Sequence, residues 1–234
     1  GDVYPQLRPT PQLLDRRWDV ECPDCGKPLS PKGTPETKPL FPTSVYAVTK
    51  QDQEQFCLIV GRSYNIPTVA LRYFNVYGPR QALSNPYTGV CAIFSARLLN
   101  GHSPLIFEDG EQTRDFVHVT DIAKANLLAL ETDRADYQTV NVGTGRATSV
   151  KEVSRLLAAG LGQNVEPEIV AKYREGDIRH CVADISRARR LLGFEPAVTL
   201  EQGIPELLSW VKEQAAKDQV EHATAELESR QLVR

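Results

Sequence analysis

An α/β fold is predicted by three features of this sequence. Residues 44–63 carry apolar side chains at helical spacing, and the Asn65-Ile66-Pro67 turn ends that pattern. The short apolar run 68–74 follows, rich in β-forming residues as buried parallel strands are, and residues 75–80 are expected to break it. A similar run at 139–143 lies between further helical segments. Because strands and helices alternate along the chain, we expect an α/β architecture.

Caps and turns predict the remaining elements. Ser149 is expected to cap a helix, with Glu152 completing a capping box, and Thr120 or Asp121 to cap an earlier helix. The further helices are expected at 89–100, 121–132, 150–160, 185–192 and 200–216. Strands are expected at 104–107, at 116–119 and around 165–170.

Both ends of the chain differ in composition from its middle. Residues 1–42 are so rich in proline that no long helix is expected there, and we interpret them as a loop-rich insert. Residues 213–234 form a charged tail. The chain contains no methionine and begins with Gly1, so we expect a processed polypeptide or a piece of a longer one.

Composition excludes two classes of partner. With 234 residues, 41% of them hydrophobic, and a net charge of −3, the chain resembles an ordinary globular protein. The negative charge, without a cluster of basic residues, argues against a nucleic-acid partner. No apolar run is long enough to span a membrane, so a soluble, cytoplasmic protein is expected.

Tyr46 and Lys50, in the stretch Ser44-Val45-Tyr46-Ala47-Val48-Thr49-Lys50, are the first candidate catalytic pair. Residues four apart share one face of a helix. A neighbouring ammonium favours the phenolate and lowers a tyrosine pKa toward working pH, which makes the tyrosine a usable general acid or base. The alternative is a partly exposed surface pair without a catalytic role.

Five further strings follow this pair in a characteristic order. They are Leu-Arg-Tyr-Phe-Asn-Val-Tyr-Gly-Pro at 71–79, Gln-Thr-Arg-Asp-Phe-Val-His-Val-Thr-Asp at 112–121, Asn-Val-Gly-Thr-Gly at 141–145, Arg-Glu-Gly-Asp at 174–177 and Ala-Asp-Ile-Ser-Arg-Ala at 183–188. Together they resemble the extended short-chain dehydrogenase/reductase family, in particular its NAD-dependent nucleoside-diphosphate-sugar epimerases and dehydratases. The resemblance covers residues 43 to about 212.

The resemblance implies a finer fold. Residues 43–76 would belong to the C-terminal part of a Rossmann-like doubly wound domain. Residues 77–212 would form a smaller α/β substrate-binding region together with returning Rossmann elements. It also implies a homodimer that associates through the helix bearing Tyr46.

The resemblance further implies roles for individual residues. Tyr46 would be the catalytic acid/base, Lys50 would hold the nicotinamide ribose and depress the pKa of Tyr46, and Phe74 would contact NAD. A second set would bind the nucleoside-diphosphate sugar. In this set Asn75, Arg114 and Arg174 would meet the diphosphate, Asp177 the ribose, and Val90 and Phe107 the nucleoside. Asp115 and His118 are interpreted as structural, and Asn75 and Asn141 could be strand-end caps instead.

The expected activity is 4-epimerisation of a dTDP- or UDP-hexose through a transient 4-keto intermediate. A nucleotide-sugar 4,6-dehydratase and a non-catalytic sugar-nucleotide binding or assembly module are the alternatives. The sequence lacks the G-x-x-G-x-x-G loop that binds the dinucleotide pyrophosphate, and it offers no secure catalytic Ser or Thr. We therefore expect the C-terminal portion of a longer enzyme, inactive by itself.

The insert contains Cys22-Pro23-Asp24-Cys25-Gly26, which has the form of one knuckle of a zinc ribbon. A structural zinc needs four ligands, and no second pair with this spacing is present in the sequence, so Cys22 and Cys25 are half of a possible site. A redox pair and two unpaired thiols are the alternatives. Cys57, Cys91 and Cys181 are expected to be buried thiols.

Overall fold

Two parallel strand pairs form the part of the fold that carries the candidate site. β1 (Ala70–Tyr73) pairs with β6 (Thr139–Val142), and β2 (Asn75–Tyr77) pairs with β5 (Phe116–His118). Parallel pairing of strands so distant in sequence confirms the α/β prediction. The structure is a computed structural model, and it describes residues 2–82, 89–214, 225, 228–229 and 233.

The predicted break after residue 74 is a change of partner instead of an end of strand structure. The N–H of Phe74 donates to the Val142 carbonyl at 3.0 Å, whereas the next N–H, that of Asn75, donates to the Asp115 carbonyl at 2.9 Å. The chain therefore leaves β6 and joins β5 within one residue. The prediction that residues 75–80 are irregular was wrong for 75–77, because an apolar run does not reveal which strand it pairs with.

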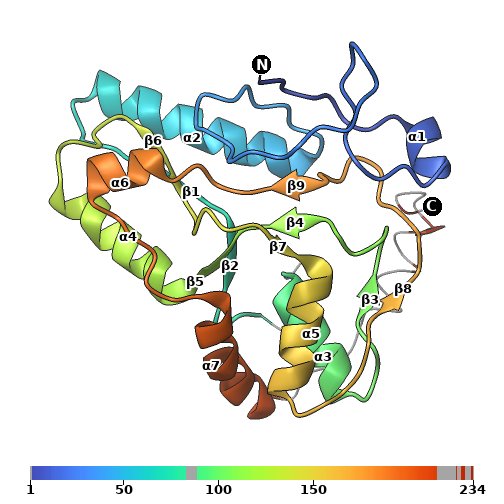
Figure 1. Cartoon of the computed structure of the whole chain (residues 1–234). Helices are drawn as coiled ribbons and strands as arrows, with labels where there is room; N and C mark the ends of the chain where they lie inside the picture. The colour runs from blue at the N-terminus through green and yellow to red at the C-terminus, as the bar shows by residue number, and fades with distance from the viewer. Residues whose placement is uncertain (1, 83–88, 215–224, 226–227, 230–232, 234) are drawn as a thin grey trace.

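Helices cover these strands. α2 (Val45–Ser63) lies along β1, while α4 (Val119–Glu131) and α6 (Ser186–Leu192) pack near β5 and β6 (Figure 1). The buried core between them is aliphatic and aromatic, with Val117, Ala125, Val140, Val142, Ala188 and Phe194 all fully buried. The helix predicted at 121–132 begins two residues earlier, at Val119, and its cap is His118, whose ring accepts from the Thr120 N–H.

A second core forms at the opposite end of the molecule, where α3 (Val90–Leu99), α5 (Val150–Gly160) and α7 (Leu200–Lys212) gather (Figure 1). It contains Tyr77, Phe94, Leu98, Ile106, Leu157 and Leu207. Ser149 caps α5 as predicted, by accepting from the Glu152 N–H at 3.1 Å. The predicted capping box is not formed, because the Glu152 side chain accepts from Arg146 at 3.2 Å instead.

Short strands connect the two cores. β4 (Thr113–Arg114) lies between β7 (Thr148–Ser149), its antiparallel neighbour, and β9 (His180–Cys181), its parallel neighbour. β3 (Leu105–Ile106) pairs in parallel with β8 (Glu168–Ile169). These strands bring residues 105–114 and 168–181 together, which is where most of the predicted substrate-binding residues lie.

The proline-rich insert contains one short helix, α1 (Thr10–Leu14), and docks onto the body through backbone and side-chain contacts. The N–H of Thr34 donates to the Val182 carbonyl at 2.7 Å, and the carboxylate of Glu36 accepts from the Asn141 N–H at 2.9 Å. The insert is therefore bound to the sheet. Most of the predicted charged tail at 213–234 lies outside the described residues.

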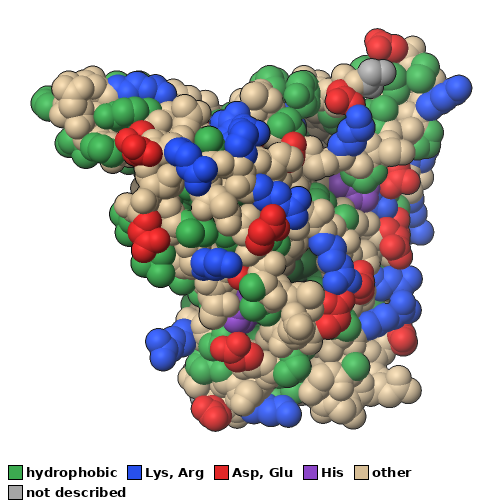
Figure 2. Space-filling view, turned by 60° about the vertical axis from the view of Figure 1, so that its left-hand side comes forward, with side chains coloured by type: hydrophobic (Ala, Val, Ile, Leu, Met, Phe, Trp, Pro, Cys, Tyr) green, Lys and Arg blue, Asp and Glu red, His purple; other side chains and the backbone are tan. Residues whose placement is uncertain are grey.

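The surface carries both signs of charge. On the face drawn in Figure 2, acidic and basic side chains are interspersed, in keeping with the small net charge. Among the described residues, no helix combines the length and the hydrophobicity that a membrane crossing requires. Cys91 is buried and Cys181 half-buried, but Cys57 is exposed, contrary to prediction, because it lies on the side of α2 that lines an open cleft.

Candidate active site

Tyr46 and Lys50 lie in the first turns of α2. Ser44 starts this helix by accepting a hydrogen bond from the Ala47 N–H at 3.1 Å. Lys50 Nζ is 5.7 Å from the centre of the Tyr46 ring and donates to Gln53 Oε1 at 3.2 Å. Tyr46 is 70% exposed. The helix thus brings the two predicted catalytic side chains together, on a face where a ligand can reach them.

This face borders a wide cleft of about 2280 Å³. Tyr46 and Lys50 line it from α2, and Phe74 and Asn75 line it from the point where the chain passes from β1 to β2. Asp177 lines it from the loop before β9. In open α/β folds, ligands bind at the carboxyl ends of strands where the strand order changes, and Phe74 and Asn75 hold such a position.

Arg114, on β4, is the best-supported cation of the site. Its Nη2 donates to Asp177 Oδ1 at 3.1 Å, and its Nη1 donates to the Arg179 carbonyl at 3.1 Å. Its side chain is 17% exposed and that of Asp177 44% exposed. The charge is therefore paired, yet close enough to solvent and to the cleft for an anionic ligand to compete for it.

Four predicted substrate residues, Val90, Phe107, Arg114 and Arg174, are not among the residues that line this cleft. Val90 begins α3 and packs against the helical core, and Phe107 is half-buried directly after β3. Arg174 is exposed and forms an isolated antiparallel bridge with Val233. The structure therefore brings Tyr46, Lys50, Phe74, Asn75 and Asp177 to one cleft, with Arg114 one contact away.

Cys22 and Cys25 adopt the tight turn that their spacing suggests. The Gly26 N–H donates to the Cys22 carbonyl at 2.9 Å, and Gly26 has a φ of +70°. Backbone N–H groups of Asp24 and Cys25 lower the pKa of Cys22. Within the described part of the chain, however, no group of three or more Cys, His, Asp or Glu could hold a metal ion. Zinc binding by Cys22 and Cys25 is not supported.

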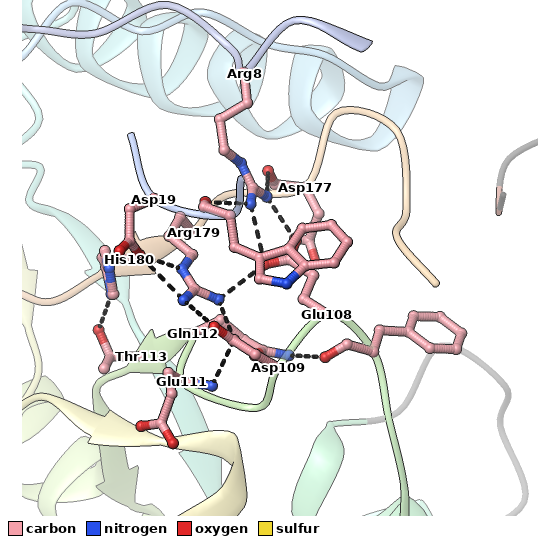
Figure 3. A network of polar contacts seen from close by, with 12 residues as sticks. Arg8, Asp19, Glu108, Asp109, Glu111, Gln112, Thr113, Asp177, Arg179 and His180 are labelled. Carbon is pink, nitrogen blue, oxygen red and sulfur yellow. Dashed lines mark hydrogen bonds and ion pairs between the residues drawn. The ribbon is translucent and has the colours of Figure 1, made fainter. Parts of the chain in front are cut away.

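A polar cluster around Arg179 was not predicted from the sequence (Figure 3). Arg179 donates to both carboxylate oxygens of Asp109, at 2.6 and 2.8 Å. Burial would raise the pKa of Asp109, but the hydrogen bonds from Arg179 outweigh it and hold that pKa below its ordinary value. Burial and the Arg179 charge lower the pKa of His180, which meets Thr113 at 2.8 Å. Two acids in the Glu108-Asp109-Gly110 turn were the available sequence signal.

The sequence profile of the NAD dependent epimerase/dehydratase family matches residues 23–143, just over half of the chain. The chain belongs to this family. Over 212 residues it is 37% identical to the dTDP-L-rhamnose 4-epimerase of Burkholderia thailandensis, an alignment that covers 91% of this chain and 57% of that protein.

Solved structures of family members share the Rossmann-like α/β fold. The UDP-glucose 4-epimerase of Thermotoga maritima, crystallised with UDP-glucose, matches with a TM-score of 0.73 at 39% identity, over 80% of this chain and 60% of that one. The NAD complex of UDP-glucose 4-epimerase from Thermus thermophilus matches with a TM-score of 0.67 at 31% identity, over 83% and 60%. This epimerase/dehydratase chain thus spans less than two thirds of the length of each relative.

The residues present fit one end of NAD. The cleft of about 2280 Å³ exceeds the ~300–1,000 Å³ of a typical small-molecule site. Tyr46, Lys50 and Phe74 line this cleft together, where the predicted contacts with the nicotinamide ribose would form. The sequence contains no G-x-x-G-x-x-G loop, whose backbone N–H groups would meet the pyrophosphate. The sequence therefore gives no prediction for the residues that would meet the pyrophosphate.

Proposed function

We propose that this chain supplies the catalytic tyrosine and the sugar-nucleotide site of an NAD-dependent 4-epimerase that acts on a dTDP- or UDP-hexose. The observation that carries the proposal is the Tyr46–Lys50 pair at the edge of a cleft that Asn75 and Asp177 also line. The names of the Burkholderia and Thermotoga relatives support the reaction and the substrate class.

Tyr46 acts as the acid/base in this proposal. Its phenolate accepts the proton of the sugar hydroxyl at C4 as that carbon is oxidised to the ketone. The Lys50 ammonium lies on the same helical face, with its Nζ 5.7 Å from the centre of the Tyr46 ring. The 4-keto sugar then rotates in the site, and Tyr46 returns a proton to the oxygen at C4 as the ketone is reduced to the new hydroxyl. NAD, when bound, supplies the hydride acceptor and donor.

The remaining predicted residues bind the nucleoside diphosphate. Arg114 presents a planar guanidinium that can donate two hydrogen bonds to a phosphate, in exchange for its contact with Asp177. Asp177 then accepts from the ribose, and Asn75 donates to the diphosphate. Arg174 is exposed, and its side chain would have to reach toward the bound diphosphate to donate to it as well. Val90 and Phe107 are proposed for the nucleoside.

A homodimer through α2 belongs to the same proposal. Val45, Phe56 and Ile59 lie on one side of this helix and are 82%, 69% and 60% exposed. An exposed apolar row of this kind is typical of a helix that packs against a partner. Size-exclusion chromatography with light scattering tests the dimer, and a charged substitution at Phe56 should dissociate it. A cytoplasmic location stays a prediction from composition.

One observation favours a second candidate, a sugar-nucleotide-binding module without catalysis. The chain lacks the glycine-rich loop, so it has few groups to hold the dinucleotide. Calorimetric titration of the full chain with NAD and with UDP- and dTDP-sugars separates the two functions. Binding of the sugar nucleotide without NAD supports the module, whereas NAD binding with interconversion of 4-epimers supports the epimerase. A 4-keto-6-deoxy product would identify a dehydratase instead.

Tyr46→Phe, introduced into an enzyme in which this chain is joined to a glycine-rich NAD-binding segment, tests the catalytic role. Because this change removes the hydroxyl that moves the proton, turnover is expected to fall by about 10²–10⁴-fold while sugar-nucleotide binding is retained. Tyr64→Phe, at an exposed tyrosine directly after the same helix, is the matched control and should leave turnover unchanged. Near-normal turnover in Tyr46→Phe would remove Tyr46 from the acid/base role.

A further inference from the structure

Arg8 of the insert enters a buried ion cluster in the body of the molecule (Figure 3). Its guanidinium donates to both carboxylate oxygens of Glu108, at 2.7 and 3.0 Å. Arg179 donates to the same carboxylate at 3.0 Å. The side chains of Arg8, Glu108 and Arg179 are only 4%, 5% and 2% exposed. One carboxylate is thus held between two buried arginines, and one of the arginines comes from the insert.

The same guanidinium also holds the loop before β9. Arg8 Nη2 donates to the Asp177 carbonyl at 3.1 Å, and Nη1 donates to the Trp18 carbonyl at 2.8 Å. A second contact from the insert joins the same loop, because the Thr10 hydroxyl donates to Glu175 at 3.0 Å. Residues 8–18 of the insert are therefore fastened to residues 175–179.

That loop in turn determines where Arg114 can lie. Its guanidinium donates to two acceptors of the loop, namely Asp177 Oδ1 and the Arg179 carbonyl. The Thr113 N–H also donates to the Arg179 carbonyl, at 3.2 Å. A continuous series of contacts thus leads from Arg8 through Asp177 and Arg179 to the guanidinium proposed to bind the diphosphate.

Glu108 shows why this arrangement depends on Arg8. It is a buried acid with a φ of +56°, a backbone conformation that a non-glycine residue adopts at a cost. A buried carboxylate is strongly destabilising when one of its partners is removed, because charge is then left uncompensated. Without Arg8, the turn at Glu108 and the loop at Asp177 lose a side chain that joins them directly.

We propose that Arg8 is a positioning residue of the sugar-nucleotide site, and that the insert is a wall of that site which holds Arg114 and Asp177 in their binding geometry. This inference rests on the proposed function for the roles of Arg114 and Asp177. It gives the insert a task that its loop-rich sequence does not reveal. It also assigns Glu108 to the interior of the cluster, with its oxygens already saturated by two arginines.

The first test follows the loop without any ligand. In the full chain, Arg8→Ala is expected to speed amide hydrogen exchange at Ile178, whose N–H donates to Asp177 Oδ1, and at Thr113. Arg17→Ala is the matched control, because it removes an exposed guanidinium from the same insert. Unchanged protection of both amides in Arg8→Ala would overturn the proposal. Arg8→Lys, which keeps the charge and loses the planar fork, should give a smaller increase and serves if the alanine variant does not fold.

The second test measures nucleotide affinity. UDP and dTDP, titrated calorimetrically into the full chain, are expected to bind Arg8→Ala about 5- to 150-fold more weakly than the unsubstituted chain. In an enzyme in which this chain is joined to a glycine-rich NAD-binding segment, the loss should appear in the KM for the sugar nucleotide and not in kcat, because Arg8 does not contact Tyr46. Equal affinity of Arg8→Ala and the unsubstituted chain would contradict the positioning role of Arg8, but it would leave the proposed function intact. An unsubstituted chain that binds neither nucleotide would contradict the proposed function, while the exchange test would still decide the role of Arg8.

Discussion

At the scale of single residues, Asp115 shows how a charged side chain within a motif can be structural. Its carboxylate is fully buried and accepts from the Thr144 N–H and hydroxyl, the Gly145 N–H and the Ala183 N–H, at 2.6 to 3.1 Å. These donors come from the loop after β6 and from the chain after β9. Asp115 therefore joins three segments, and its oxygens are too fully bonded for a catalytic role, as the sequence predicted.

Asp115→Asn should destabilise the protein by about 1–3 kcal/mol. The amide nitrogen that replaces one carboxylate oxygen would face backbone N–H groups, so buried donors would lose their acceptor. Urea unfolding followed by circular dichroism measures the free energy of unfolding. Asp133→Asn, at an exposed aspartate, is the control and should change it by less than about 0.5 kcal/mol. Equal effects of the two substitutions would refute the structural role of Asp115.

At the scale of elements, the change from β1 to β2 decides where the candidate site lies. Phe74 and Asn75 are adjacent in sequence but bond to different strands, and both line the cleft. α2 places Tyr46 and Lys50 at the same cleft. The site is thus built where one helix begins and two strands meet, and no single element contains it.

An ion pair network centred on Arg146 joins the starts of α5 and α7. Arg146 pairs with Glu201 in the first turn of α7 at 2.7 Å and with Glu152 in the first turn of α5 at 3.2 Å. The hydrogen bond from Arg146 lowers the pKa of Glu201 from its ordinary 4.5 to about 2. A carboxylate with a depressed pKa in the folded state contributes stability above its unfolded-state pKa. That contribution is lost as the pH falls from about 4.5 toward 2.

Glu201→Gln should therefore lower the free energy of unfolding at pH 7 and have no effect near pH 2. Both partners are almost half exposed, so solvent screening limits the difference to about 1 kcal/mol or less. Urea titrations at pH 7, 4 and 2 measure it. Glu213→Gln, at the exposed C-cap of the same helix, should show no such pH dependence. A Glu201→Gln effect that is the same at all three pH values would show that the ion pair is not its cause.

At the scale of the whole molecule, local patterns predicted the elements better than their partners. Local signals, namely helical spacing of apolar residues for α2 and caps and turns for α3, α5 and α6, predicted these helices to within a residue or two at each end, because such signals lie within or beside the helix itself. The same logic could not show that Asn75 pairs with β5. It also could not reveal that Arg8 meets Glu108, since that contact joins residues 100 apart in the chain.

The candidate site divides in the same way. Tyr46, Lys50, Phe74, Asn75 and Asp177 meet at one cleft, as the order of the motifs suggested. Arg174, which was predicted to bind the diphosphate, is not among the residues that line this cleft. Arg179 and Asp109 form a hydrogen-bonded ion pair in the neighbouring cluster, and the sequence did not predict that pair. A short motif can predict ligand-binding side chains because the residues lie within one segment of the chain. Buried ion clusters depend on how separate segments pack, and no pattern within one segment encodes that.

The two cores offer a last measurement, because one of them contains a natural thiol probe. Cys91 lies in the core of α3, α5 and α7, and burial raises its pKa to about 12. Cys25 and Cys57 are exposed. With an excess of a thiol reagent at pH 8, we expect rapid labelling of Cys25 and Cys57, while Cys91 should react only when its core opens, since the thiolate is the reactive form.

Mass spectrometry of labelled peptides across a urea series measures both rates. The Cys91 rate should rise with urea in step with the loss of circular dichroism, and the Cys57 rate should stay nearly constant as the internal control. Labelling of Cys91 as fast as Cys57 without urea would show that the helical core opens independently of global unfolding.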